Sequence, residues 1–186
     1  GSGDFTFSRG SNLSATRVKE DGYIEKGYEN LLLQSNSFNT WSFTSGSSVT
    51  SGQTGYDGSN DAWLFTDGGT STAFGAYLDI SLSSVCTASI YVKASSTSVI
   101  DFDIFYSSGT AQGLAVNLLN GSVVNSTNAV IGFNVEDVGN GWYRISFTAN
   151  VVNALYFRFG CNGAGSILIQ DAQLNQGLVA LPYVES

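Results

Sequence analysis

The stretch Val99–Ser107 carries the residue types that could perform chemistry. Asp101 and Asp103 are two positions apart in an alternating run whose other positions are apolar. Side chains two apart on a strand share a face, so we expect both carboxylates and Phe105 on one outward face. Paired carboxylates can hydrolyse a glycosidic bond when they flank the sugar at roughly 5 to 9.5 Å. Neighbours on one strand lie about 7 Å apart but approach a sugar from one side. We therefore expect no catalysis from this pair.

The same residue types suit the binding of a sugar. Carbohydrates present an apolar C–H face to aromatic rings, and they present hydroxyl groups to carboxylates, amides and guanidinium groups. We predict a site in which two rings stack on the sugar and four polar side chains hydrogen-bond to it. Its members are Asp101, Asp103, Phe105, Asn117, Tyr156 and Arg158. The alternative is an Asp–Arg pair between neighbouring strands that only keeps the sheet surface polar.

The amino-acid inventory excludes several other chemistries. The chain has no histidine, so a Ser-His-Asp or Cys-His nucleophile and a Cys/His metal site are excluded. Cys86 and Cys161 are the only cysteines, and both are in phase with core-facing residues. We expect two buried free thiols, and a disulfide only if the strands bring their Cα atoms within roughly 7 Å.

The formal net charge of −8 repels phosphate groups, so we expect neither nucleic-acid binding nor attraction to an anionic membrane. No run approaches the roughly 20 apolar residues that span a bilayer. Gly1-Ser-Gly3 has no basic region or apolar core, so we also expect no signal peptide.

The elements that must position these residues are strands. A chain of 186 residues with 22 glycines suits one turn-rich domain, and its period-two segments are too closely spaced for crossover helices. We predict an all-β, two-sheet antiparallel jelly-roll sandwich over residues 29–186, preceded by a short N-terminal arm or linker over residues 1–28. The arm is expected to form a hairpin turning at Asp21-Gly22. The predicted strands are Asn30–Gln34, Trp41–Thr44, Ala62–Thr66, Thr72–Ile80, Cys86–Ala94, Val99–Ser107, Gly113–Leu119, Ile131–Val135, Trp142–Ala149, Ala154–Cys161 and Ser166–Leu174.

The three tryptophans have different phases. Trp41 is in phase with Phe43 and Trp63 with Phe65, so we expect both indoles in the core. Trp142 falls on the polar phase at the start of its strand, where a ring can cap the edge of the sandwich.

Several segments resemble a module of phage virion proteins that is attached to tail fibres or other particle appendages. Phe7–Glu25 is similar to a recurring stretch with the pattern Ser-Ala-Thr-Arg-Val followed by Asp-Gly-x-Ile-Glu. The connection between Glu25 and Asn30 is shorter than in many members of this group. Further similar segments are Asn30–Phe38 with Trp41, Tyr91–Ala94, Gly141–Ser146, and Ala172–Leu174 with Pro182 and Tyr183.

The resemblance implies a jelly roll like that of carbohydrate-binding modules, carried on the virion surface outside the cell. It favours a non-catalytic module that attaches the particle to a host surface polysaccharide. The alternative is a structural decoration or spacer domain that contacts other virion proteins. The resemblance also implies a homo-oligomer, since such appendages are commonly trimeric. No cofactor is required, but Asp171 stands where such modules hold a structural calcium, with Asn39 or carbonyls of Ser35–Asn39 as further ligands.

Overall fold

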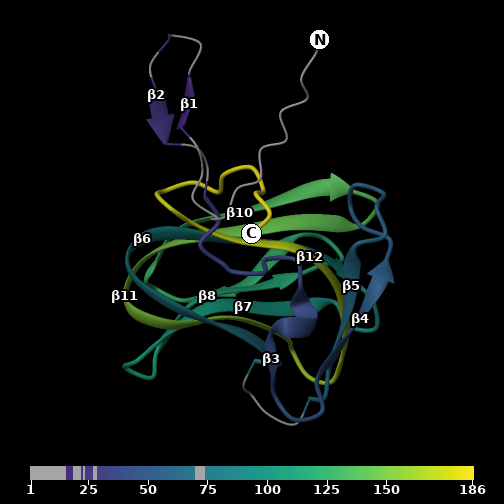
Figure 1. Ribbon diagram of the computed structural model, residues 1–186. Coiled ribbons are helices and arrows are strands. Elements are labelled where there is room, and N and C mark those ends of the chain that lie inside the picture. The colour runs from purple at the N-terminus through teal and green to yellow at the C-terminus, as the bar shows by residue number, and fades with distance from the viewer. Residues whose placement is uncertain (1–15, 19–21, 23, 27–28, 70–73) are drawn as a thin grey trace, which may run out of the picture.

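The computed structural model describes residues 16–18, 22, 24–26, 29–69 and 74–186. Within these ranges the only helical element is one 3₁₀ turn, η1 (Phe38–Thr40), and no helix is long and apolar enough to cross a membrane. The remaining elements are antiparallel strands (Figure 1), which confirms the predicted all-β class. They are β1 (Thr16–Val18), β2 (Ile24–Lys26), β3 (Ser42–Phe43), β4 (Ser48–Gln53), β5 (Ala62–Asp67), β6 (Ala76–Ala94), β7 (Val99–Tyr106), β8 (Ala111–Asn117), β9 (Ser122–Ser126), β10 (Val130–Gly139), β11 (Trp142–Cys161) and β12 (Gly165–Gln176).

Two packed sheets form the sandwich, and β6 and β11 run through both of them. The first sheet has the order β4, β5, β12, the second half of β6, the first half of β11, and β10. The second sheet has the order β3, the first half of β6, the second half of β11, β7, β8 and β9. The curved paths of β6 and β11 around one side of the barrel-like sandwich are visible in Figure 1.

The two long strands correct a prediction. The sequence predicted two separate strands in the region of β6 and two in the region of β11, but each pair is one continuous strand. In β11 the register shifts between Val151 and Ala154 and again before Tyr156, and Asn153 has a φ of 52°. Such bulges bend a strand without ending its pairing. The apparent sequence breaks are therefore bends at which a strand passes from one sheet to the other.

One apolar core lies between the sheets. The inward side chains of β7, Ile100, Phe102 and Ile104, are fully buried, as are Phe157 and Phe159 of β11. The Phe102 and Phe157 rings meet edge to face with their centroids 5.1 Å apart. This burial confirms the predicted phase, so the alternate residues of β7 and of the second half of β11 face outward.

Other predictions about single elements were wrong in detail. Asn30–Gln34 forms turns, because the Asn30 Oδ1 atom accepts hydrogen bonds from the backbone of Leu32 and Leu174 instead of continuing a ladder. The sequence analysis missed β4 and β9, whose polar, glycine-containing or exposed residues show no clear alternation. In the arm, β1 and β2 pair antiparallel as the predicted hairpin, in a sheet separate from the sandwich.

The tryptophans and cysteines follow their predicted phases, but the burial of three of them differs from the prediction. Trp41 is in the core, whereas Trp63 is only partly buried against it. Trp142 has the predicted outward phase but is 1% exposed. Its indole meets the ring of Tyr56 edge to face at 6.4 Å between centroids, so a loop covers it. Both cysteines are free thiols; Cys86 is buried, but Cys161 is half-buried at the edge of the core.

Candidate functional site

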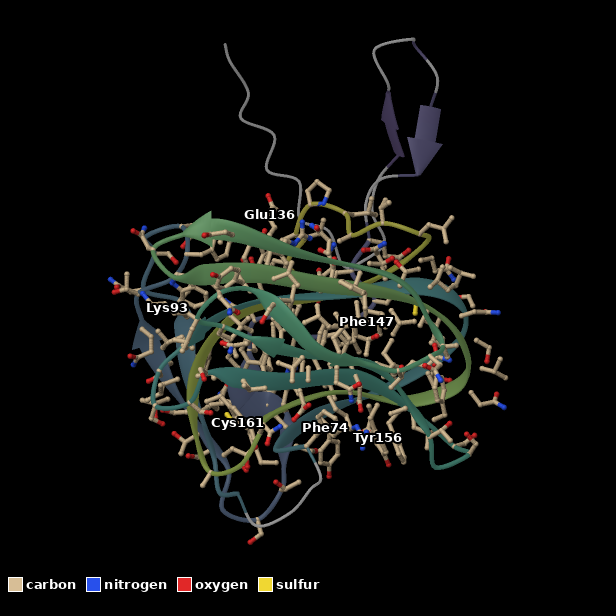
Figure 2. All side chains as sticks on the ribbon, turned by 180° about the vertical axis from the view of Figure 1, so that it is seen from behind. Phe74, Lys93, Glu136, Phe147, Tyr156 and Cys161 are labelled. Carbon is tan, nitrogen blue, oxygen red and sulfur yellow. The ribbon has the colours of Figure 1, made fainter. Side chains whose placement is uncertain are left out.

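The outward face of the second sheet carries a row of aromatic rings on three adjacent strands. Tyr156 of β11 stands directly opposite Phe105 of β7, and the two rings are nearly parallel with centroids 6.1 Å apart. On the other side, Tyr77 of β6 meets Tyr156 edge to face at 5.2 Å. All three rings are half-buried. Figure 2 shows Tyr156 together with Phe74 at this side of the sandwich. We call this row of Tyr77, Tyr156 and Phe105 the aromatic row.

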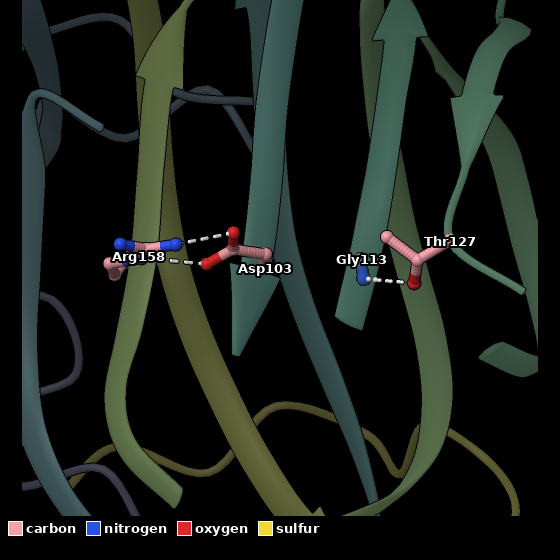
Figure 3. Close-up of polar contacts among 4 residues, drawn as sticks. All are labelled: Asp103, Gly113, Thr127 and Arg158. Carbon is pink, nitrogen blue, oxygen red and sulfur yellow. Dashed lines mark hydrogen bonds and ion pairs between the residues drawn. The ribbon is translucent and has the colours of Figure 1, made fainter. Parts of the chain in front are cut away.

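An ion pair lies beside the aromatic row. Arg158 of β11 is directly opposite Asp103 of β7, so the guanidinium group reaches the carboxylate across one strand spacing. Nε donates to Oδ1 at 2.8 Å and Nη2 to Oδ2 at 2.7 Å, a two-pronged contact drawn in Figure 3. The guanidinium carbon lies 4.1 Å from the ring centroid of Phe105 and 4.2 Å from that of Phe74. This arrangement fixes Arg158 by charge, hydrogen bonds and cation–π contact together.

The ion pair is largely removed from water. The side chains of Arg158 and Asp103 are 15% and 7% exposed. Burial raises the pKa of Asp103, and the hydrogen bonds and charge of Arg158 oppose that rise. Gly113 permits this packing, since a Cβ atom there would lie 2.1 Å from the carbonyl oxygen of Phe102 and 2.5 Å from the Asp103 Cβ. The Gly113 N–H donates to Thr127 Oγ1 at 3.1 Å, also in Figure 3.

Two other carboxylates on this face are not neutralised. Asp101 is half-buried, and burial raises its pKa, yet its carboxylate has no hydrogen-bond partner among the described residues. Asp79 of β6 stands directly opposite Tyr156 and is exposed. Both groups can accept hydrogen bonds from hydroxyl groups of a ligand that rests on the rings.

The structure brings together five of the six predicted site residues: Asp101, Asp103, Phe105, Tyr156 and Arg158. The sixth, Asn117, lies at the end of β8, where its Oδ1 atom accepts a hydrogen bond from the Leu119 backbone at 2.9 Å. It closes a turn and is not part of the cluster. Sequence reasoning missed Tyr77 and Asp79, although the alternation of β6 places them on the polar side. It missed Phe74, which lies within the predicted strand Thr72–Ile80 but in phase with the core-facing Ala76, and which the structure places just before β6.

This geometry does not provide the arrangement needed for glycoside hydrolysis. Asp101 and Asp103 lie on one strand, and Asp103 is bound on both oxygens by Arg158. A general acid must be free to donate its proton and must oppose a second carboxylate across the sugar. The face has the features of a binding surface.

Asp171, the predicted calcium ligand, is held by hydrogen bonds within the protein. Its Oδ2 atom accepts a hydrogen bond from the Tyr56 hydroxyl at 2.9 Å, and its backbone N–H donates to Asn36 Oδ1. The described residues contain no group of three acidic, cysteine or histidine side chains placed to hold a metal ion. Ser35 lies close by, as predicted, but its carbonyl accepts from the backbone of Ala172. Burial raises the pKa of Asp171 to about 6.

No known protein-family profile and no curated protein matches the sequence. Among solved structures, the chain is similar to the CBM22-1 xylan-binding domain from Paenibacillus barcinonensis Xyn10C, with a TM-score of 0.55 and 18% identity over 84% of this chain and 99% of that domain. This similarity agrees with the jelly-roll sandwich and concerns the fold alone.

Two weaker similarities were found. One is to the enzymatically active domain of bacteriophage CBA120 tailspike protein 4, with a TM-score of 0.39, 14% identity, and coverage of 81% of this chain and 21% of that one. The other is to TmCBM61, solved in complex with β-1,4-galactotriose, with a TM-score of 0.40, 12% identity, and coverage of 80% and 99%.

Proposed function

We propose that this chain is a non-catalytic carbohydrate-binding module that holds a neutral glycan on the outward face of its second sheet. The single observation that carries the proposal is the aromatic row of Tyr77, Tyr156 and Phe105, which crosses three neighbouring strands with carboxylates on its flanks. Strands lie about 4.8 Å apart, so a ligand that spans the row meets successive rings along its length.

Each part of the face matches one feature of a sugar. The half-buried rings of Tyr156 and Phe105 offer apolar surface to the C–H face of a pyranose. Asp79 and Asp101 accept hydrogen bonds from hydroxyl groups. The ion pair of Arg158 and Asp103 holds the Phe105 ring in place, because the guanidinium group stacks on that ring. A fixed platform loses little conformational entropy on binding.

Charge selects the class of glycan. The chain carries a net charge of −8, and the one basic side chain in the cluster, Arg158, is already neutralised by Asp103. An acidic polysaccharide would meet unpaired Asp79 and Asp101 with no cation to compensate them. A neutral glycan meets no such repulsion.

The resemblance to phage appendage modules gives this binding a biological setting. We place the module on the surface of a phage particle, outside the cell, where it would attach to a host surface polysaccharide and be joined to other virion proteins. Assembly as a homo-oligomer would present several copies of the face and raise the overall affinity for a repetitive polymer.

A glycan array that contains neutral and acidic oligosaccharides tests this proposal. We expect the purified protein to bind neutral members and not acidic ones. A protein that binds no glycan but forms a stable complex with another virion protein through the same face would instead be a structural spacer. Binding restricted to acidic members would contradict the charge argument.

A further inference from the structure

A groove of about 550 Å³ lies on the opposite side of the sandwich, on the outward face of the first sheet. Its floor is formed by Thr87, Ser146 and Thr148, and the C-terminal segment 178–180 makes one wall. The other wall is the edge strand β10. Figure 2 shows Glu136 on β10 beside this C-terminal segment. The volume is within the range of roughly 300 to 1,000 Å³ that is usual for ligand sites.

The groove exists because the C-terminal segment covers only part of this face. Thr87 and Thr148 donate hydrogen bonds to the carbonyl oxygens of Gly177 and Leu178, at 2.9 and 3.1 Å. These bonds hold the segment over β6 and β11 and leave the strip between it and β10 open. The wall is thus anchored through its backbone, and the side chains of Leu178 and Val179 remain 66% and 65% exposed.

The open strip combines hydrogen-bond donors and acceptors. Glu136 of β10 is directly opposite Arg144 of β11, and Asn134 is directly opposite Ser146. The Nη2 atom of Arg144 donates to the Leu181 carbonyl and the Ser89 hydroxyl, but its buried Nε has no partner in the described part of the chain. Glu136 and Asn134 are exposed. The groove therefore offers hydrogen-bond acceptors and donors without a net charge.

The groove also offers apolar surface suited to a sugar ring. The Leu178 and Val179 side chains of the C-terminal wall are exposed, whereas Phe133, directly opposite the buried Phe147, turns its ring to the other face of β10. A polar floor beside an apolar wall matches a molecule with hydroxyl rims and C–H faces.

We propose that this groove is a second carbohydrate site, which takes a short segment of a neutral glycan chain. The Leu178 and Val179 side chains contact the C–H face of one sugar, while Glu136 and Asn134 bind its hydroxyl groups. A second protein copy that extends the sheet would pair with the backbone edge of β10 and leave the polar floor unused, so the glycan is favoured. This site does not depend on the aromatic row. With sites on opposite faces, one module can join two glycan chains.

The test is an amide nuclear magnetic resonance titration with a library of neutral gluco-, manno-, galacto- and xylo-oligosaccharides of three to six units. We expect at least one saccharide to shift the amides of 132–136 and 178–180 in the natural protein. The Tyr156→Ala variant should keep these shifts and lose those of β7. The Glu136→Gln variant should weaken the groove shifts at least tenfold and leave the β7 shifts intact. The matched control Val152→Ala, 64% exposed and outside both faces, should change neither.

The other outcomes separate the two sites. Shifts confined to the aromatic row would overturn the second site and leave the proposed function standing. Shifts confined to the groove would support the second site and contradict the aromatic row. If no saccharide shifts either region, both proposals are wrong. If the β10 amides shift with protein concentration alone and not with saccharide, a second copy occupies this edge and the carbohydrate assignment is overturned.

Discussion

The outward faces of the two sheets differ in what fills them, although both arise from the same period-two alternation. On the second sheet the outward residues include large rings and charges, which pack on one another and remain half-buried. On the first sheet they include hydroxyls and amides such as Thr87, Ser89, Gln173 and Asn175, each 2% exposed or less. Thr87, Gln173 and Asn175 bind the backbone of the C-terminal segment, and Ser89 accepts a hydrogen bond from Arg144. A polar outward face is therefore not always a free face, because small hydrogen-bonding side chains can hold another part of the same chain.

A substitution in the core, which supports both faces, should cause the largest loss of stability. We expect Phe157→Ala to lower the free energy of unfolding by about 3 to 5 kcal/mol, because it leaves a cavity between the sheets. Chemical denaturation measures this loss. A loss below about 1 kcal/mol would mean that Phe157 does not fill the core. Tyr156→Ala, one position earlier on the outward face, is the matched control and should cost far less.

Breaking the ion pair of the second sheet should cause the next largest loss of stability. Arg158→Met leaves the buried Asp103 carboxylate without its partner. Breaking a fully buried pair lowers the free energy of unfolding by about 3 to 5 kcal/mol. Because this pair is partly exposed, we expect a loss of about 2 to 3 kcal/mol. Asp103 then protonates more readily, so the deficit relative to the natural protein should shrink as pH falls towards 4. Denaturation curves at pH 7 and pH 4 test this. An equal deficit at both pH values would mean that lost packing, and not an unpaired charge, causes the effect.

The contacts of the first sheet allow a parallel experiment. The Gln173 amide donates to the Leu181 carbonyl at 2.9 Å and accepts from the Val184 backbone at 2.8 Å. Gln173→Ala leaves both backbone groups unpaired, and we expect a loss of about 1 to 3 kcal/mol. Amide hydrogen exchange should show faster exchange at Val184 in this variant. Unchanged exchange there would show that the C-terminal segment is held by other contacts.

A smaller, pH-dependent effect should come from Asp171. Its pKa in the fold, about 6, lies above its ordinary value of 3.8, so the folded state binds the proton more tightly than the unfolded state. The stability contribution is fully present below about pH 4 and is lost as pH rises to about 6. We expect Asp171→Asn to remove this loss of stability between about pH 4 and pH 6, which amounts to about 1 to 2 kcal/mol after allowance for solvent. Asn is the suitable replacement because it tolerates the φ of 52° found at this position.

Thermal melts of both proteins from pH 4 to pH 7 provide the measurement for Asp171. Parallel pH profiles for the two proteins would contradict the assigned pKa. Repeating the melts with added calcium tests the predicted ion: a calcium-dependent rise in Tm that Asp171→Asn abolishes would place calcium at this residue.

The sequence predicted the parts of the molecule that depend on alternation. Ile100, Phe102 and Ile104 face inward in β7 as predicted. Asp103 and Arg158, predicted as sugar contacts, instead form the cross-strand Asp–Arg pair that was the alternative. Alternation gives the face of a residue but not its partner. The sequence alone therefore did not show that the ion pair is closed over by Phe74 or that Asn117 binds a turn.

The contacts of residues 177–186 were beyond sequence reasoning for a related reason. This segment has no period-two pattern, and it is held by side chains that are distant in the sequence, such as Thr87 and Thr148. The groove on the first sheet exists only because that segment lies where it does. The same lack of a local signal explains why β6 and β11 were each predicted as two strands, since a bend between sheets resembles a turn.

The central claim is that the aromatic row binds a glycan, and the most direct test is the affinity of Tyr156→Ala for the neutral oligosaccharide that binds best on the array. Titration calorimetry and a thermal melt would be carried out on the same samples, with Val152→Ala as control. We predict at least a tenfold loss of affinity at this face with a nearly unchanged Tm, because a half-buried ring leaves little cavity when it is removed. Unchanged affinity, or unfolding of the variant, would contradict the claim.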